Sequence, residues 1–125
     1  MVRRIPPPRV DAETQPFWDA ASQGKLLLKR CRACGAAHYF PRPRCPFCLG
    51  ETDWFEASGL GEIYTFSVTR RGDIYAIAYV ALDEGVTLIT NIVDCDLDAL
   101  RIGQRVRVTF MPSDGGPPVP MFRPA

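Results

Sequence analysis

Residues 31–50 read CRACGAAHYFPRPRCPFCLG and contain two Cys-x-x-Cys pairs separated by ten residues. Within each pair the two thiolates can converge on one point, and Gly35 permits a tight turn that directs backbone N–H groups at sulfur. Two such pairs complete a tetrahedral sulfur shell, which leaves no coordination position open for a substrate. The spacing therefore predicts one structural zinc ion, bound by Cys31, Cys34, Cys45 and Cys48.

The alternatives for the same four cysteines are disulfides, a redox pair or an iron–sulfur cluster. The first eight residues, MVRRIPPP, lack the apolar core of a signal peptide, and no run approaches the roughly 20 apolar residues of a membrane helix. We therefore expect a cytoplasmic chain that does not enter the membrane, where disulfides are disfavoured. Because 18 residues cannot build a core alone, zinc should supply on the order of 10 kcal/mol of the ribbon's folding free energy.

The segment before the cysteines predicts an extended arm followed by one short helix. Residues 1–10 are rich in Pro and Arg, so they form either a frayed end or an arm that a partner orders. Thr14 suits the N-cap of a helix, the apolar Phe17 and Ala21 are spaced one turn apart, and Gly24 suits its end. The expected organisation is an arm and helix over 1–24, a zinc ribbon over 25–57 and a barrel over 58–125.

The segment after the cysteines predicts a mostly β fold. Five alternating or apolar runs indicate strands, with a helical turn over 94–100 after the third of them; the runs are 62–68, 76–82, 87–93, 105–111 and 119–122. Five short strands with one inserted helical turn favour a small OB-fold barrel, with a β-sandwich as the alternative. On the first strand, Tyr64 and Phe66 are interpreted as core residues.

No constellation of residues typical of an enzyme is visible in the sequence. The single histidine, His38, has no nucleophile motif beside it, and we expect it to face solvent or to contact the zinc ligands. Cys95 lies between Asp94 and Asp96, whose charges raise a thiol pKa, so it is interpreted as a small buried residue. An independent enzyme is accordingly the least favoured class.

Binding is the remaining class of function. Six cations and no carboxylate lie between Lys25 and Gly50, although the formal net charge of the chain is only +1. Arg70 and Arg71 follow the strand that holds Tyr64, and arginine beside aromatic side chains suits single-stranded nucleic acid or a nucleotide-bearing cofactor such as coenzyme A. The small net charge argues against a nucleic-acid partner.

An ordered set of motifs gives this chain a resemblance to a known family. Besides the two cysteine pairs, the set comprises Pro16-Phe17-Trp18, Gly24-Lys25-Leu26, Pro41-Arg42-Pro43, Gly59-Leu60-Gly61, Ile63-Tyr64-Thr65-Phe66 and Phe122-Arg123-Pro124. It resembles the acyl-CoA-associated family that joins a zinc ribbon to an OB-fold and was long classed as a domain of unknown function. The resemblance covers the chain from about Gln15 to its end.

The resemblance implies a fold and a function. The fold is a short helix, a rubredoxin-like zinc ribbon and a five-stranded OB-fold barrel. The function is that of a non-catalytic accessory subunit that binds a thiolase-superfamily enzyme, such as a thiolase, a hydroxymethylglutaryl-CoA synthase or a steroid side-chain aldolase, in lipid or steroid metabolism. Some members are fused to a hot-dog-fold hydratase.

By the same resemblance, contacts with acyl-CoA fall to Arg42, Arg70 and Arg71. The 70–73 stretch is, however, shorter than the Pro-containing loop typical of the family, which weakens the expectation for the last two. The alternative function is a nucleic-acid-binding module, because zinc ribbons and OB barrels also occur in such proteins.

Overall fold

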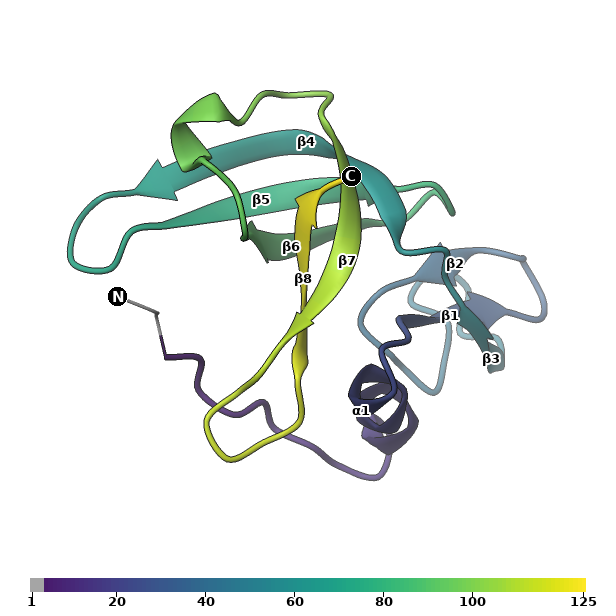
Figure 1. Cartoon of the computed structure of the whole chain (residues 1–125). Helices are drawn as coiled ribbons and strands as arrows, with labels where there is room; N and C mark the ends of the chain where they lie inside the picture. Colours follow the sequence, from purple (N-terminus) through teal and green to yellow (C-terminus); the bar gives the residue numbers. More distant parts are fainter. Residues whose placement is uncertain (1–3) are drawn as a thin grey trace.

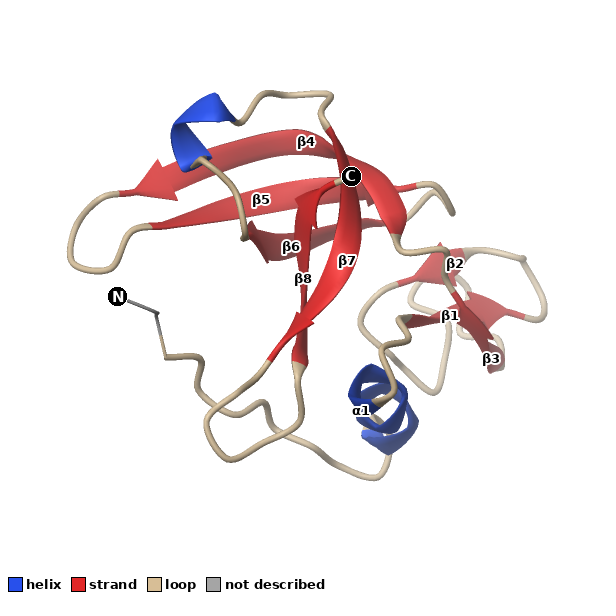
Figure 2. Cartoon of the chain, viewed as in Figure 1, coloured by secondary structure: helices blue, strands red, loops and turns tan. Residues whose placement is uncertain are grey.

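The computed structural model describes residues 4–125 as a small three-stranded sheet beside a closed five-stranded barrel (Figures 1 and 2). One α-helix precedes the small sheet, and one 3-10 turn lies within the barrel. The elements are α1 (Gln15–Ser22), β1 (Leu27–Cys31), β2 (Ala37–His38), β3 (Thr52–Glu56), β4 (Leu60–Thr69), β5 (Tyr75–Leu82), β6 (Thr87–Ile92), η1 (Leu97–Ala99), β7 (Arg105–Met111) and β8 (Val119–Pro124). The predicted fold class is confirmed, and the sandwich alternative is wrong because the sheet closes on itself.

Helix α1 covers the ribbon with one apolar face. Phe17, Trp18 and Ala21 are its buried residues, and the Phe17 ring meets the Tyr39 ring edge-on at 5.9 Å between centroids. Gly24 follows the helix with φ +77°, which a glycine adopts without strain. Thr14 occupies the N-cap position, but its side chain does not cap the helix; it is hydrogen-bonded to Asp11 instead.

The ribbon sheet has β1 at its centre. β2 and β3 both pair with it antiparallel, so that His38 lies opposite Lys29 on one side and Trp54 lies opposite Lys29 on the other. The long loop between β2 and β3 carries the second cysteine pair. This arrangement brings the two cysteine pairs to one end of a sheet that contains only twelve strand residues.

The barrel has the strand order β4-β5-β6-β8-β7, and β7 pairs back with β4 to close it. Its interior is filled by small and branched side chains and one fully buried ring, that of Phe122. Gly61 marks a close approach of β4 to β5, because a Cβ there would lie 2.6 Å from the carbonyl oxygen of Ala81. The sequence thus has a glycine where β4 and β5 come into close contact.

A β-bulge in β4 corrects the assignment of Tyr64 to the core. The pairing of β4 with β5 shifts between Ile63 and Thr65, so Tyr64 is the extra residue. Ile63 is 1% exposed, whereas Tyr64 points outward and is 67% exposed. Phe66, beyond the bulge, is half-buried and packs against the core as predicted. Strict alternation failed here because one inserted residue changes the phase of the strand.

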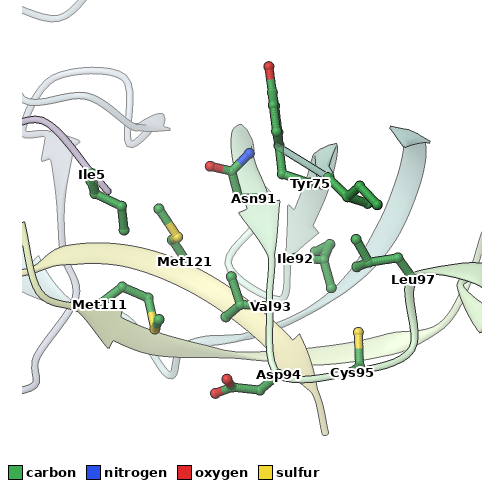
Figure 3. A pocket seen from close by; sticks show the side chains of 11 residues that line it. Ile5, Tyr75, Asn91, Ile92, Val93, Asp94, Cys95, Leu97, Met111 and Met121 are labelled. Atoms are coloured by element: carbon green, nitrogen blue, oxygen red, sulfur yellow. The ribbon is translucent and has the colours of Figure 1, made fainter. Parts of the chain in front are cut away.

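The N-terminal arm lies along the loop between β7 and β8 over the described residues 4–10; residues 1–3 of the predicted arm fall outside the described part. The Asp114 N–H donates to the Ile5 carbonyl at 2.8 Å, and the Arg4 guanidinium pairs with the Asp114 carboxylate at 2.6 Å. The Ile5 side chain lines an apolar pocket of about 220 Å³ with Met111, Met121 and Cys95 (Figure 3). The arm therefore packs on its own barrel.

Cys95 is half-buried in that pocket, which modifies the expectation of a fully buried residue. Burial raises the pKa of its thiol, and the charges of Asp96 and Asp94 raise the pKa further, as the sequence predicted.

Among residues 4–125, no helix has the length and apolar character needed to cross a membrane.

Candidate metal centre

The fold brings the four predicted cysteine ligands together. Their sulfur atoms all lie within 4.8 Å of one another, and the two closest pairs join the two halves of the motif. The Sγ atoms of Cys31 and Cys48 are 3.4 Å apart, and those of Cys34 and Cys45 are 3.7 Å apart. Four sulfurs at about 2.3 Å from a central ion form a tetrahedron with edges of about 3.8 Å, so the cage has the size that zinc requires.

Backbone N–H groups point at the sulfurs, as in a metal-binding knuckle. Ala33 and Cys34 donate to the Cys31 sulfur at 3.3 and 3.4 Å, and Phe47 donates to the Cys45 sulfur at 3.4 Å. Such donors stabilise thiolate rather than thiol. The geometry thus favours the charged form of sulfur that binds metal.

The shifted pKa values of two of the cysteines favour a positive charge at the centre of the cage. The backbone N–H of Cys34 is the largest of the causes that lower the pKa of Cys31 to about 6. The N–H of Gly50 acts in the same direction on Cys48, but the sulfurs of Cys31, Cys34 and Cys45 outweigh it and raise the Cys48 pKa to about 12. The pKa of Cys31 falls and that of Cys48 rises for the same reason: their sulfurs are in contact, so one thiol ionises and the other keeps its proton. A divalent cation would let all four ionise.

The two knuckles differ at the residue that follows the second cysteine. Gly35 occupies this place in the first knuckle with φ +75°, and Leu49 occupies it in the second with φ +63°. Gly50, one residue later, fills another role. A Cβ at Gly50 would lie 2.8 Å from the Cys31 sulfur and 3.3 Å from the Cys48 sulfur, so only glycine fits against the cage.

Of the two expectations for His38, the solvent-facing one is wrong. His38 is 5% exposed, and neither ring nitrogen has a hydrogen-bond partner among the described residues. Burial lowers its pKa, and the charges of Lys29 and Arg42 lower it further, so the imidazole is neutral at pH 7. The metal-ligating cluster that the described residues form contains cysteines alone.

The structure reduces the free charge of the basic ribbon segment. Arg32 pairs with Asp53 at 2.7 Å and with Glu51 at 3.0 Å, both residues lying just beyond the segment that lacks carboxylates. Arg30 lies over the Phe55 ring and Lys29 over the Trp54 ring. Sequence reasoning missed these partners because the pairing of β1 with β3 is not visible in local spacing.

The three arginines predicted to contact coenzyme A do not form one site. Arg42 lies in the loop between the cysteine pairs, whereas Arg70 and Arg71 lie in the turn between β4 and β5, at the end of the barrel away from the ribbon (Figure 1). Arg70 is, in addition, ion-paired with Asp98 in η1. The two groups of arginines cannot contact one phosphate together.

These features define a class: a small protein that joins a four-cysteine zinc ribbon to an OB-fold barrel. Residues 18–54 match the family described as "ChsH2, rubredoxin-like zinc ribbon domain", and residues 54–111 match "ChsH2, C-terminal OB-fold domain". The chain belongs to this family, which also carries the designation DUF35.

Relatives in sequence come from bacteria and archaea. A probable enoyl-CoA hydratase alpha subunit of Thermomonospora curvata is 34% identical over 128 residues, covering 96% of this chain. The chain spans only 40% of that relative's length. DUF35 domain-containing scaffold proteins of Methanocaldococcus jannaschii and Methanothermobacter thermautotrophicus are 34% and 36% identical, each over 68% of this chain and over 67% and 71% of their own lengths.

Two solved structures share the fold. One chain of the Ltp2-ChsH2(DUF35) aldolase superposes with a TM-score of 0.81 and 32% identity, covering 94% of this chain and 98% of that one. A DUF35 protein of unknown function from Sulfolobus solfataricus superposes with a TM-score of 0.63 and 13% identity over 79% and 78% of the two chains, a likeness of fold alone.

Proposed function

We propose that this chain is a zinc-stabilised scaffold subunit that binds a thiolase-superfamily or aldolase enzyme and assists it with acyl-CoA substrates. The observation that carries the proposal is the likeness, at 32% identity and over nearly the whole of both chains, to a component of an aldolase complex. The archaeal relatives, which are described as scaffold proteins, support the same role. The hydratase relative supports an acyl-CoA substrate and a hydratase as a further partner.

The zinc ion in this proposal is structural and would be held by Cys31, Cys34, Cys45 and Cys48. When bound, it supplies the positive charge that four neighbouring thiolates need. The chain's own part is to direct backbone N–H groups at the sulfurs and to hold the β2–β3 loop in place, since the Thr52 hydroxyl donates to the Arg42 carbonyl at 2.9 Å. Loss of zinc should therefore abolish assembly rather than chemistry.

Contacts with coenzyme A remain part of the proposal in a narrower form. Arg42 and Arg71 take part in no ion pair among the described residues, so either can meet a phosphate at its own end of the molecule. Arg70 would first have to leave Asp98. A cofactor held at the interface with the enzyme would use one group of arginines or the other.

A nucleic-acid-binding role is less well supported. Tyr64 and Tyr79 are exposed on the barrel, as base-stacking would need. Strands β4, β5 and β6, which display them, contain neither Lys nor Arg. Stacking platforms for single strands normally lie beside cations that neutralise phosphates.

The test is purification of the untagged chain from its native cells in the presence of zinc. A thiolase-superfamily or aldolase subunit in stoichiometric amount is the expected result. Tight, salt-sensitive binding of oligonucleotides by the isolated chain, with no enzyme subunit recovered, would overturn the proposal in favour of the nucleic-acid alternative.

A further inference from the structure

Leu49 adopts a left-handed backbone conformation, which glycine adopts more easily than leucine does. Its φ of +63° lies in the left-handed region, which strains the backbone of a residue with a Cβ. The first knuckle uses Gly35 at the same place and avoids this strain. A strained leucine where glycine would serve points to a use for its side chain beyond the fold.

The leucine side chain is not used inside the molecule. Leu49 is 74% exposed and Phe47 is 72% exposed, the two highest values among the large apolar residues of the described part. They flank Cys48, whose sulfur belongs to the rigid cage, so the two apolar side chains project from a fixed base. Exposed apolar groups on a rigid turn are typical of an anchor for a partner.

Two cations next to this anchor are also unused. Arg32 is neutralised by carboxylates, and Lys29 and Arg30 lie over aromatic rings. Arg42 and Arg44 take part in no ion pair among residues 4–125. Charge complementarity therefore requires an acidic group on whatever covers this surface.

Three of these unused groups lie around one cleft. Arg42, Arg44 and Leu49 line a cavity of about 460 Å³, and Asp11 and Glu13 line it as well. The loop that carries the two arginines is fixed by the Thr52 hydroxyl, which donates to the Arg42 and Pro43 carbonyls at 2.9 and 3.2 Å. The acidic pair would repel carboxylates that entered in the wrong register, so the cleft also sets orientation.

We propose that this surface, the second-knuckle surface made of Arg42, Arg44, Phe47 and Leu49, binds a segment of the partner enzyme subunit that combines carboxylates with large apolar side chains. The inference rests on the proposed function and adds to it the place of docking. The partner's apolar side chains cover Phe47 and Leu49, and its carboxylates pair with Arg42 and Arg44. The cost of the leucine conformation is offset only in the complex.

The decisive variant is Leu49→Gly, titrated by calorimetry against the purified enzyme subunit that co-purifies with this chain. Relief of strain should leave zinc affinity unchanged or raise it by up to about fivefold, whereas affinity for the enzyme subunit should fall at least tenfold. A residue with a merely structural role would change both in the same direction. Phe47→Ser should weaken binding similarly. The double variant Arg42→Gln, Arg44→Gln should weaken it and remove most of its salt dependence.

The matched controls lie on the barrel. Ile102→Gly removes an apolar side chain that is 69% exposed, and Arg101→Glu reverses an exposed cation, and neither should alter binding by more than twofold. If wild type binds the enzyme and the knuckle variants bind equally well, the inference is wrong and the proposed function stands. If wild type does not bind the enzyme, both fail. A homodimer of the isolated chain that Leu49→Gly dissociates, with enzyme affinity unchanged, would assign the surface to a second copy and overturn the inference.

Discussion

Replacement of Gly50 by alanine adds one methyl group beside the metal-binding cysteines and so tests how tightly Gly50 packs against them. The new Cβ would lie 2.8 Å from the Cys31 sulfur, 3.1 Å from the Ala33 Cβ and 3.3 Å from the Cys48 sulfur. The backbone at Gly50 is not left-handed, so alanine adds no conformational strain and the whole effect is contact with the cage. Neither sulfur can withdraw easily, because a bound zinc ion would hold both in place.

The expected magnitude follows from overpacking. An extra methyl group in a rigid site costs typically 1–3 kcal/mol, and a value of about 2 kcal/mol corresponds to roughly 30-fold weaker zinc binding. Competition with a chromogenic chelator at pH 7 measures the affinity, and the cobalt-loaded protein reports in its visible spectrum whether all four thiolates still bind.

Gly72→Ala is the control. Gly72 has φ +73° and open space around its Cβ position, so alanine strains the β4–β5 turn without approaching the metal. This variant should lose about 1 kcal/mol of barrel stability and keep its zinc affinity. A Gly50→Ala protein with zinc affinity within twofold of wild type would refute the described packing of Gly50 against the cage.

Three further predictions follow from the same geometry. Removal of zinc by chelation should expose the amides of residues 25–57 to hydrogen exchange while the barrel amides stay protected; equal protection in both parts with and without zinc would contradict a fold-forming metal. Arg32→Ala should raise the pKa of Asp53 towards its ordinary 3.8, since the Arg32 hydrogen bond is the main cause that lowers it. The stability that Asp53 contributes is present above its unfolded pKa and disappears as the pH falls through the lower folded value, and carbon-detected NMR titration of both proteins checks the shift. His38→Leu should keep or raise stability by about 1 kcal/mol, because it removes two buried nitrogens without partners. The lowered pKa of His38 means that wild type loses stability as the pH falls below 6.5, and urea unfolding at pH 7 and pH 5.5 should show a smaller loss in the variant.

The metal site could be predicted from the sequence because its four ligands lie close together along the chain. A Cys-x-x-Cys pair fixes two sulfurs within one turn of the chain, and ten intervening residues limit how far the pairs can separate. The barrel strands could also be predicted. The apolar run 76–82 lies within β5, and in the alternating stretch 105–111 Val106 is buried between the exposed Arg105 and Arg107. Gly24 ended the helix where its conformational freedom predicted.

Other assignments failed where distant residues decide the outcome. Tyr64 points to solvent because the bulge opposite β5 shifts the phase of its strand, and no local signal in 62–68 announces that shift. His38 lies on β2 and is buried, although its neighbours in sequence gave no such indication. Cys95 is half-buried rather than buried, since it borders a pocket that the N-terminal arm helps to form.

The sequence by itself determined that this chain has a four-thiolate cage and a five-stranded barrel, because cysteine spacing and strand periodicity act over a few residues. Only the tertiary structure decided which charges and apolar groups are free to meet a partner. The pairing of β1 with β3 brings Asp53 and Glu51 to Arg32, whereas Arg42 and Arg44 take part in no ion pair within residues 4–125. The fold also places the β2–β3 loop, which contains Arg42, and the β4–β5 turn, which contains Arg70, at opposite ends of the molecule (Figure 1). Which residues become neighbours depends on how the strands pair rather than on sequence distance.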